Sequence, residues 1–201
     1  MSEGPAYRSG FVAVVGRPNV GKSTLVNALV GGKAAIVSDK PQTTRNSVRA
    51  VLNDPRGQIV FVDTPGLHRP LHRLGRFLER QAAASLEAAD VVCFMVEAGD
   101  SRVGKADGII LDLLERIRVP VVLVVNKIDA HDRDHSPYGW ECFTRRRGFA
   151  HVLAVSALEG RNLDLLVETL FDLLPPGPPI FDDDRLVDCT ERFLAAEVIR
   201  E

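Results

Sequence analysis

Short apolar runs alternate along the chain with longer stretches in which apolar residues recur at helical spacing. Strands are predicted at residues 11–15, 47–52, 58–62, 91–96, 121–125 and 151–155, and helices at 23–30, 76–88, 105–117, 138–147 and 163–174. Strands that are apolar on both sides belong to a sheet covered on both faces. The alternation therefore predicts an α/β fold: a doubly wound, mostly parallel six-stranded sheet with helices on both faces.

One pair of strands is expected to break the parallel pattern. Residues 54–57 read Asp-Pro-Arg-Gly, a turn sequence between the second and third predicted strands. A parallel crossover needs a dozen or more residues. We therefore expect these two strands to be antiparallel, with one of them at the edge of the sheet.

The pattern changes after residue 174. Residues 175–179 read Pro-Pro-Gly-Pro-Pro, typical of a stiff linker, and Asp188 with Glu191 has the spacing of a capping box. We expect one domain at residues 1–174, and a linker with a further helix at residues 175–201. That helix is either the first element of a truncated second domain or a helix that docks back on the first domain.

Composition and charge exclude several classes of protein. The 25 Lys and Arg against 27 Asp and Glu give a net charge of −2, with no global basic signature of a nucleic-acid binder. No apolar run approaches the roughly 20 residues that span a bilayer. The three cysteines, Cys93, Cys142 and Cys189, are far apart and odd in number. They favour buried or incidental thiols in a reducing cytoplasm over a disulfide framework or a zinc site.

A phosphate-binding loop is predicted between the first strand and the first helix. The segment from Gly16 to Ser23 has glycine, four residues and then Gly-Lys-Ser. Its glycines let backbone N–H groups approach phosphate oxygens; Lys22 should reach the β- and γ-phosphates, and Ser23 should ligate Mg²⁺. The predicted nucleotide contacts here are Gly16, Arg17, Pro18, Asn19, Val20, Gly21, Lys22, Ser23 and Thr24.

Two loops are predicted to complete the metal and γ-phosphate site. Asp63 follows the third strand, where its carboxylate suits the surroundings of Mg²⁺, and the Gly66 N–H can face the γ-phosphate. Of the paired threonines after the first helix, Thr44 is the first choice to close over Mg²⁺ and Thr43 the second. The contacts predicted from the loop after the third strand are Asp63, Thr64, Pro65, Gly66 and Leu67.

A base-recognition site is predicted at the ends of the last two strands, where open α/β sheets bind ligands. The Asp129 carboxylate can accept two hydrogen bonds from guanine that adenine cannot offer. Asn126 can tie this loop to the phosphate loop, and a backbone N–H of residues 156–158 can face the guanine carbonyl. The predicted contacts are Asn126, Lys127, Ile128, Asp129, Ser156, Ala157 and Leu158.

Together these motifs resemble the Era-like family of the translation-factor-related GTPases. Gln42 and Asn46, which flank Thr43-Thr44-Arg45, favour this branch, and residues 192–201 resemble the entry into a KH domain. The resemblance implies hydrolysis of GTP to GDP and phosphate with Mg²⁺, and an RNA-binding KH domain missing from this chain. For a full-length protein it implies binding to 16S ribosomal RNA, a role in assembling the 30S subunit, and peripheral association with the inner membrane surface; we expect a monomer.

The catalytic machinery is less clear-cut in the sequence. Lys22, Thr44, Gly66 and Asn19 are the candidates, because Leu67 cannot orient water as a glutamine would. The resemblance implies a K⁺ ion on the Asn19 oxygen in place of an arginine finger; the alternative is that Asn19 only shapes the loop. Slow, potassium-stimulated turnover is expected.

Three alternatives stay open. The chain could be an ATP-using phosphate-loop enzyme, although the motif at residues 126–129 argues against it. It could also bind nucleotide with negligible turnover. A basic stretch after the second loop is either a solvated face or a contact for RNA, which this chain alone should bind weakly. That stretch comprises Arg69, Arg73, Arg76 and Arg80.

Overall fold

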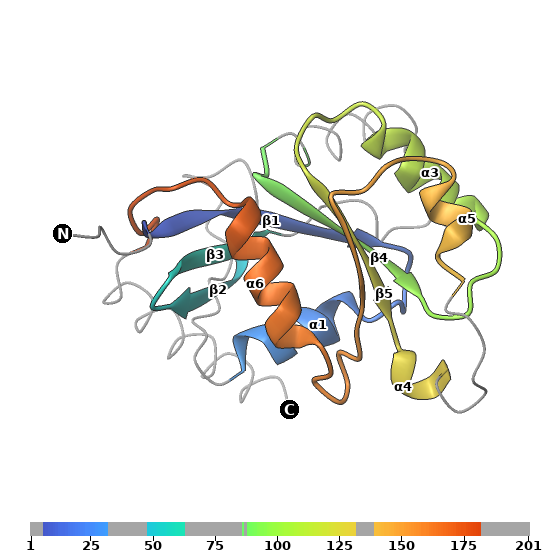
Figure 1. Cartoon of the computed structure of the whole chain (residues 1–201), viewed down its shortest axis with the longest axis horizontal. Helices are drawn as coiled ribbons and strands as arrows, with labels where there is room; N and C mark the ends of the chain where they lie inside the picture. The colour runs from blue at the N-terminus through green and yellow to red at the C-terminus, as the bar shows by residue number, and fades with distance from the viewer. Residues whose placement is uncertain (1–5, 32–47, 63–85, 87, 132–138, 182–201) are drawn as a thin grey trace, which may run out of the picture.

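The computed structural model describes residues 6–31, 48–62, 86, 88–131 and 139–181 (Figure 1). Its strands are β1 (Arg8–Gly16), β2 (Val48–Asp54), β3 (Gly57–Val62), β4 (Val91–Glu97), β5 (Val121–Asn126) and β6 (His151–Ala154). Its helices are α1 (Lys22–Val30), α3 (Lys105–Leu114), α4 (Ile128–His131), α5 (Glu141–Thr144) and α6 (Leu163–Leu173). No helix in these ranges is long and apolar enough to cross a membrane.

The six strands form one sheet in the order β2-β3-β1-β4-β5-β6. Strand β1 is parallel to both β3 and β4, β4 to β5, and β5 to β6. Only β2 runs antiparallel, against β3 at the edge. The predicted fold class is confirmed, including the antiparallel edge strand. The arrangement brings the carboxyl ends of β1, β4 and β5 side by side.

Helices cover both faces of the sheet, and alternate residues of β1 feed two separate cores (Figure 1). Val12 and Val14 belong to the core shared with α1 and α6, whereas Ala13 and Val15 belong to the core shared with α3 and α5. Because side chains alternate along a strand, an unbroken apolar run is needed to fill both sides. Helix residues in these cores include Leu25 and Leu166 on one face, and Leu111 and Phe143 on the other.

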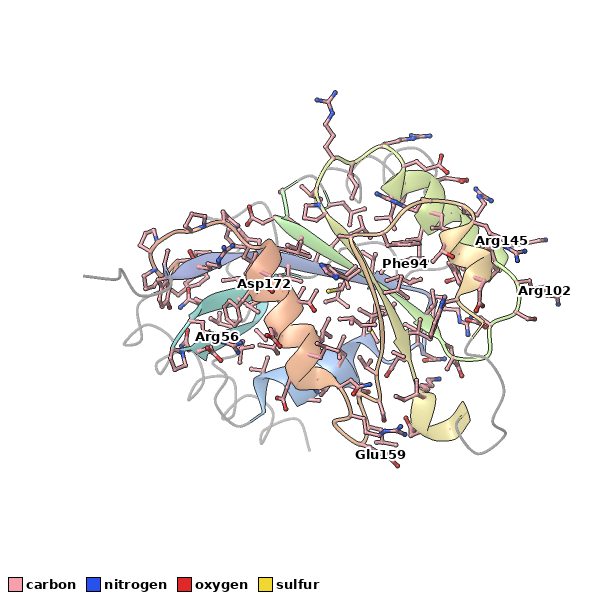
Figure 2. All side chains as sticks on the ribbon, in the orientation of Figure 1. Arg56, Phe94, Arg102, Arg145, Glu159 and Asp172 are labelled. Carbon is pink, nitrogen blue, oxygen red and sulfur yellow. The ribbon has the colours of Figure 1, made fainter. Side chains whose placement is uncertain are left out.

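Aromatic packing fills the second core beneath α5. Phe94 of β4 is fully buried, and Figure 2 shows it in the interior, whereas Arg102 and Arg145 extend outward. The Phe143 ring meets it edge-on with centroids 5.9 Å apart. Cys93, the neighbour of Phe94, is also buried, and desolvation raises the pKa of its thiol to about 12. The expectation of an inert, buried thiol holds at Cys93.

The described part of the proline-rich segment lies along the sheet. The Ser9 N–H donates to the Pro175 carbonyl at 3.3 Å, and the Gly177 N–H donates to the Tyr7 carbonyl at 3.0 Å. The Ser9 hydroxyl donates to the Pro178 carbonyl at 2.6 Å. Residues 175–181 are thus held against β1 rather than projecting from the domain as a free spacer.

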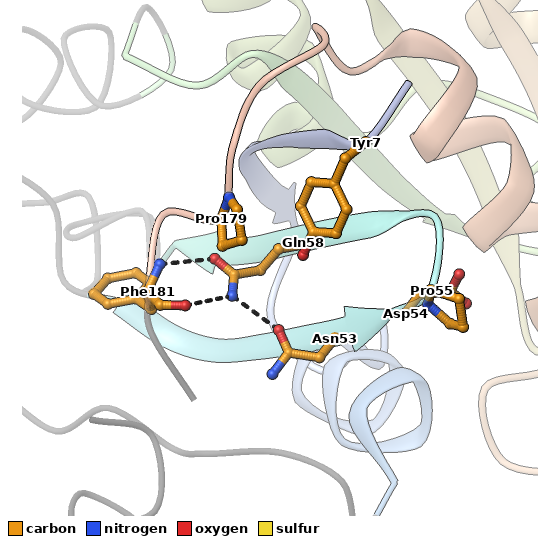
Figure 3. A pocket seen from close by; sticks show the side chains of 7 residues that line it. All are labelled: Tyr7, Asn53, Asp54, Pro55, Gln58, Pro179 and Phe181. Carbon is orange, nitrogen blue, oxygen red and sulfur yellow. Dashed lines mark hydrogen bonds between the residues drawn. The ribbon is translucent and has the colours of Figure 1, made fainter. Parts of the chain in front are cut away.

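A single buried amide fixes the end of this segment. Gln58 of β3 is 1% exposed, and its Oε1 accepts from the N–H groups of Ile180 at 2.8 Å and Phe181 at 2.9 Å. Its Nε2 donates to the Phe181 carbonyl at 2.9 Å and to Asn53 Oδ1 at 2.8 Å (Figure 3). These groups line a pocket with Tyr7, Asp54, Pro55 and Pro179.

Several helices end sooner than the apolar pattern suggests. The helix predicted at residues 138–147 is reduced to α5, because Gly139 has φ 80° and Arg146 and Arg147 bond back to the Phe143 carbonyl in a closing turn. The helix predicted at 105–117 ends at Leu114. Of the helix predicted at 76–88, only Leu86 and Ala88 are described, and Leu86 is helical and buried. The helix predicted beyond residue 188 lies outside the described residues.

Candidate functional site

The phosphate loop leaves β1 at Gly16 and enters α1 at Lys22, as the motif requires. A Cβ on Gly16 would lie 2.5 Å from the Met95 carbonyl oxygen, too close for any side chain. Gly21 has φ 103°, and a Cβ there would lie 2.4 Å from Asn126 Nδ2. Both glycines are therefore required by their close approach to residues of β4 and β5, which gives the motif its physical reason.

The start of α1 presents a favourable place for an anion. Gly21 has no side chain, so it makes no side-chain cap hydrogen bond to the first turn of the helix. Ser23 and Thr24 stand in this turn, both exposed. A helix N-terminus with open N–H groups and a partial positive charge is suited to a phosphate.

Lys22 lies across the phosphate loop. Its side chain is buried, with 7% exposure, and its Nζ donates to the carbonyls of Gly16 at 2.8 Å and Arg17 at 2.7 Å. The ammonium is thus held at the loop by two backbone carbonyls. This placement fits the prediction that Lys22 faces phosphate oxygens.

Asn126 connects the phosphate loop to the last loop of the sheet. Its Nδ2 donates to the Val20 carbonyl at 2.9 Å, and its Oδ1 accepts from the Ala157 N–H at 2.9 Å. The side chain is 2% exposed, so these bonds form in a water-poor interior. The bond to the phosphate loop is the one predicted for Asn126, and the bond to Ala157, which was not predicted, adds a third segment that is distant in the sequence.

The Asp129 carboxylate is oriented by the Ser156 hydroxyl, a role that was not predicted for this side chain. Ser156 Oγ donates to Asp129 Oδ1 at 2.5 Å and accepts from the Glu159 N–H at 3.0 Å. The Ser156 N–H donates to the Arg161 carbonyl, and the Ala157 N–H is engaged by Asn126. In this conformation the N–H groups of Ser156 and Ala157 are thus bonded within the protein. Leu158, the next residue, is 78% exposed.

A cluster of charges behind the phosphate loop was not predicted. Arg17 donates from Nη1 to Asp100 Oδ2 at 2.8 Å and from Nη2 to Glu97 Oε2 at 3.0 Å, and its Nη1 also lies 3.4 Å from Asp107 Oδ2. The signal for Glu97 and Asp100 was present in the sequence, because Glu97 ends β4 and Asp100 follows three residues later, next to the carboxyl end of β1. The sequence held no such signal for Asp107, because a carboxylate in the first turn of a helix usually only interacts with the helix dipole.

The remaining predicted residues fall into two groups. Pro18 and Asn19 are exposed in the loop, and Asn19 has φ 63°, a left-handed conformation that asparagine tolerates better than most residues. Ile128 is buried at 1% exposure and belongs to the core. Other predicted site residues lie outside the described residues: Thr43, Thr44, Asp63, Thr64, Pro65, Gly66 and Leu67.

The residues present fit a phosphate and the start of a magnesium site. Ser23 contributes an exposed hydroxyl beside the open N–H groups of α1, which suits a hard cation bound together with phosphate oxygens. Within the described ranges, no group of three or more His, Cys, Asp or Glu side chains could hold a metal by itself.

Comparison with known proteins agrees with this geometry. Residues 11–127 match the model of the family described as 50S ribosome-binding GTPase. GTPase Era from Carboxydothermus hydrogenoformans is 47% identical over 196 residues, which are 98% of this chain and 65% of that protein. The chain therefore spans about two thirds of that relative's length.

Two solved structures resemble the fold closely. An Era variant from Aquifex aeolicus bound to GDP and AlF₄⁻ is 40% identical with a TM-score of 0.70, covering 88% of this chain and 60% of that one. Era in complex with MgGDPNP and nucleotides 1506–1542 of 16S ribosomal RNA is 40% identical with a TM-score of 0.71, covering 89% of this chain and 61% of that one.

The sheet order, the phosphate loop and the strand-end motif define the class of phosphate-loop GTPase domains. With a family model that matches more than half of its length, the chain belongs to the 50S ribosome-binding GTPase family, and its similar relatives are GTPases named Era.

Proposed function

We propose that this chain is the nucleotide-binding part of a guanine-nucleotide switch, which binds GTP and GDP with Mg²⁺ and hydrolyses GTP to GDP and phosphate. The observation that carries the proposal is the Asn126 bridge. It places the base-recognition carboxylate and the phosphate loop on one rigid frame, in which Asn126 holds Val20 on one side and Ala157 on the other. A nucleoside triphosphate needs both halves at once.

The base is read by Asp129. Its carboxylate accepts hydrogen bonds from N1–H and the exocyclic amine of guanine, and Ser156 fixes the plane of the carboxylate. Adenine offers no matching pair of donors to this carboxylate, so ATP is disfavoured. This argument favours a GTPase over an ATP-using enzyme.

The phosphates are held by the loop from Gly16 to Thr24. Its N–H groups and the positive end of α1 meet the α- and β-phosphates, and Lys22 turns its charge to the β- and γ-phosphates. Ser23 would hold Mg²⁺, with Thr44 and Asp63 as the other expected residues at the metal; bound Mg²⁺ neutralises charge on the phosphate tail. The Gly66 N–H would contact the γ-phosphate.

Turnover is proposed to be slow and stimulated by potassium. Leu67 offers no group that orients water, so charge stabilisation must carry much of the catalysis. The Asn19 oxygen would hold K⁺ near the phosphates. Its left-handed backbone also supports the simpler role of shaping the loop, and potassium dependence separates the two.

The partners of a longer protein are proposed from its relatives. Because a similar Era binds a fragment of 16S ribosomal RNA, we infer that the whole protein containing this chain contacts that RNA and the 30S subunit. With a net charge of −2, this chain alone should bind RNA weakly and salt-dependently, at a Kd of roughly 10⁻⁴ to 10⁻⁶ M. A cytoplasmic monomer with peripheral membrane contact remains our prediction for the whole protein.

The decisive experiment measures binding and turnover with one protein preparation. Fluorescent GDP is titrated with GTP, GDP and ATP as competitors, with and without Mg²⁺, and phosphate release from GTP is followed in single turnover. Guanine-specific binding with slow release supports the proposal. Equal competition by ATP would overturn the base assignment, and binding without any release would leave a nucleotide-binding module.

A further inference from the structure

We infer that the Arg17 side chain is the positioning residue of the nucleotide site: its guanidinium anchors the phosphate loop to β4 and α3 and, through Glu97, to Lys127 of the base-recognition motif. The inference rests on the proposed nucleotide site but goes beyond it, because the motif pattern demands only a backbone at this position. Both terminal nitrogens of the Arg17 guanidinium, Nη1 and Nη2, contact carboxylates.

The Arg17 guanidinium contacts three carboxylates at once. Arg17 contacts Glu97, the last residue of β4, at 3.0 Å, Asp100 in the loop after β4 at 2.8 Å, and Asp107 in the first turn of α3 at 3.4 Å. The Arg17 side chain is 27% exposed, and that of Asp107 only 1%. A planar guanidinium can serve several carboxylates in fixed directions, which a lysine ammonium cannot do.

The residue whose side chain forms this anchor also binds Lys22 through its backbone. The Arg17 carbonyl accepts from Lys22 Nζ at 2.7 Å, while the Arg17 side chain is held by the carboxylates of Glu97, Asp100 and Asp107. Moving the side chain would move this carbonyl and the ammonium bonded to it. The network therefore acts on the phosphate charge through the backbone, which is what a positioning residue does.

Glu97 links Arg17 to Lys127 of the base-recognition motif. Its Oε2 contacts Arg17 Nη2 at 3.0 Å and Lys127 Nζ at 3.1 Å, and it is paired with Asn126 in the sheet register. Burial alone would raise the pKa of the Glu97 carboxyl, yet hydrogen bonds from Lys127 and Arg17 hold it below its ordinary value of 4.5. A charged Glu97 thus links the two halves of the site at neutral pH.

Asp107 makes the arrangement costly to break. One of its oxygens, Oδ1, is buried without a hydrogen-bond partner, so the Arg17 contact is a principal compensation for this carboxylate. Removing one partner of a buried ion pair leaves an uncompensated charge, which is strongly destabilising. Loss of Arg17 should therefore lower both stability and nucleotide affinity, and the test must separate the two effects.

The test compares four variants of the intact chain with the parent: Arg17→Ala, Arg17→Lys, Arg17→Ala with Asp107→Asn, and Arg146→Ala. The last variant breaks an exposed ion pair to Asp112 at 3.0 Å and is the matched control. Thermal unfolding without nucleotide reports stability. Titration with fluorescent GDP reports affinity, and its dissociation rate reports how firmly the loop is held.

We expect Arg17→Ala to weaken GDP binding by about tenfold or more, in line with the loss of a charge-assisted contact. Arg17→Lys should recover only part of the lost GDP affinity. Arg146→Ala should lose neither stability nor GDP affinity. Adding Asp107→Asn to Arg17→Ala should restore the unfolding temperature but not the GDP affinity.

Three results would overturn the inference. GDP binding by Arg17→Ala equal to that of the parent removes the positioning role. Recovery of affinity together with stability in the double variant reduces Arg17 to a neutraliser of Asp107. Absence of GDP binding by the parent itself would overturn the proposed function and this inference together, and is recognised by the parent measurement alone.

Discussion

Asn126 donates its side-chain amide to the carbonyl oxygen of Val20 across 2.9 Å, although 106 positions separate them in the chain. The bond is buried and fixes the height of the phosphate loop above the sheet. Because Val20 itself is fully buried, the loop cannot shift without exposing both partners. The base-recognition strand therefore serves as the support of the phosphate loop.

Replacing Asn126 with alanine should weaken GDP binding by about tenfold and destabilise the fold by about 1–3 kcal/mol. The change leaves the Val20 carbonyl and the Ala157 N–H buried without their partner. Urea unfolding and GDP titration measure the two effects. Asn126→Asp keeps the acceptor for Ala157 but loses the donor to Val20 and buries a carboxylate against the Val20 carbonyl, so it should lose at least as much stability; parent-like stability in either variant would contradict the role of the Val20 bond.

Asp129→Asn should abolish the preference for guanine over other purines. An amide cannot accept both hydrogen bonds, yet it offers a donor that suits the carbonyl of xanthine. Competition of GDP, ADP and XDP against fluorescent nucleotide measures the shift, with Asp164→Asn on the exposed face of α6 as the control. Unchanged GDP affinity in Asp129→Asn would show that the base is placed elsewhere.

Potassium should accelerate GTP hydrolysis over sodium at equal ionic strength, and Asn19→Gly should remove that advantage. Glycine keeps the left-handed backbone that Asn19 adopts at φ 63° while it removes the side-chain oxygen. Asn19→Ala removes the oxygen as well and adds about 1 kcal/mol of backbone strain. Turnover of all three proteins in matched salts is the measurement. A potassium advantage that survives in Asn19→Gly would leave Asn19 as a loop-shaping residue.

Gln58→Leu should destabilise the fold by about 1–3 kcal/mol and release residues 180 and 181 from the sheet. The leucine fills similar volume but leaves the Ile180 and Phe181 N–H groups without their acceptor. Amide hydrogen exchange at these two positions reports the release, and urea unfolding the stability. Gln58→Glu retains an acceptor and should protect both amides better; protection unchanged in Gln58→Leu would contradict the clamp.

Asp107→Asn should gain stability over the parent as the pH rises from about 4 towards neutrality. Burial raises the pKa of Asp107 above its ordinary value of 3.8, against the charges of Arg17 and Lys22 and together with that of Asp100. The folded parent then binds more protons than the unfolded chain above pH 3.8, so its stability falls with rising pH. Thermal unfolding from pH 4 to 7 measures the gap between the two proteins. Asp112→Asn, at an exposed position of the same helix, should show no such trend.

The sequence by itself determined the elements and the motifs. Apolar runs long enough for a strand and apolar on both sides required a covered parallel sheet, and the four-residue turn at Asp54 required one antiparallel pair. The phosphate loop and the motif at residues 126–129 were recognisable because each depends on local spacing and on its place at a strand end. Their chemistry is carried by residue types at fixed separations.

Only the tertiary structure decided which distant side chains meet. The Ser156 hydroxyl on Asp129, the grip of Gln58 on residues 180–181, and the Arg17 contacts with Glu97, Asp100 and Asp107 join segments that no spacing rule connects. An arginine, a glutamine or a serine looks the same in a sequence whether it faces water or a buried partner. The difference lies in desolvation, which gives a hydrogen bond or an ion pair its energetic weight only after the fold has removed water from around it.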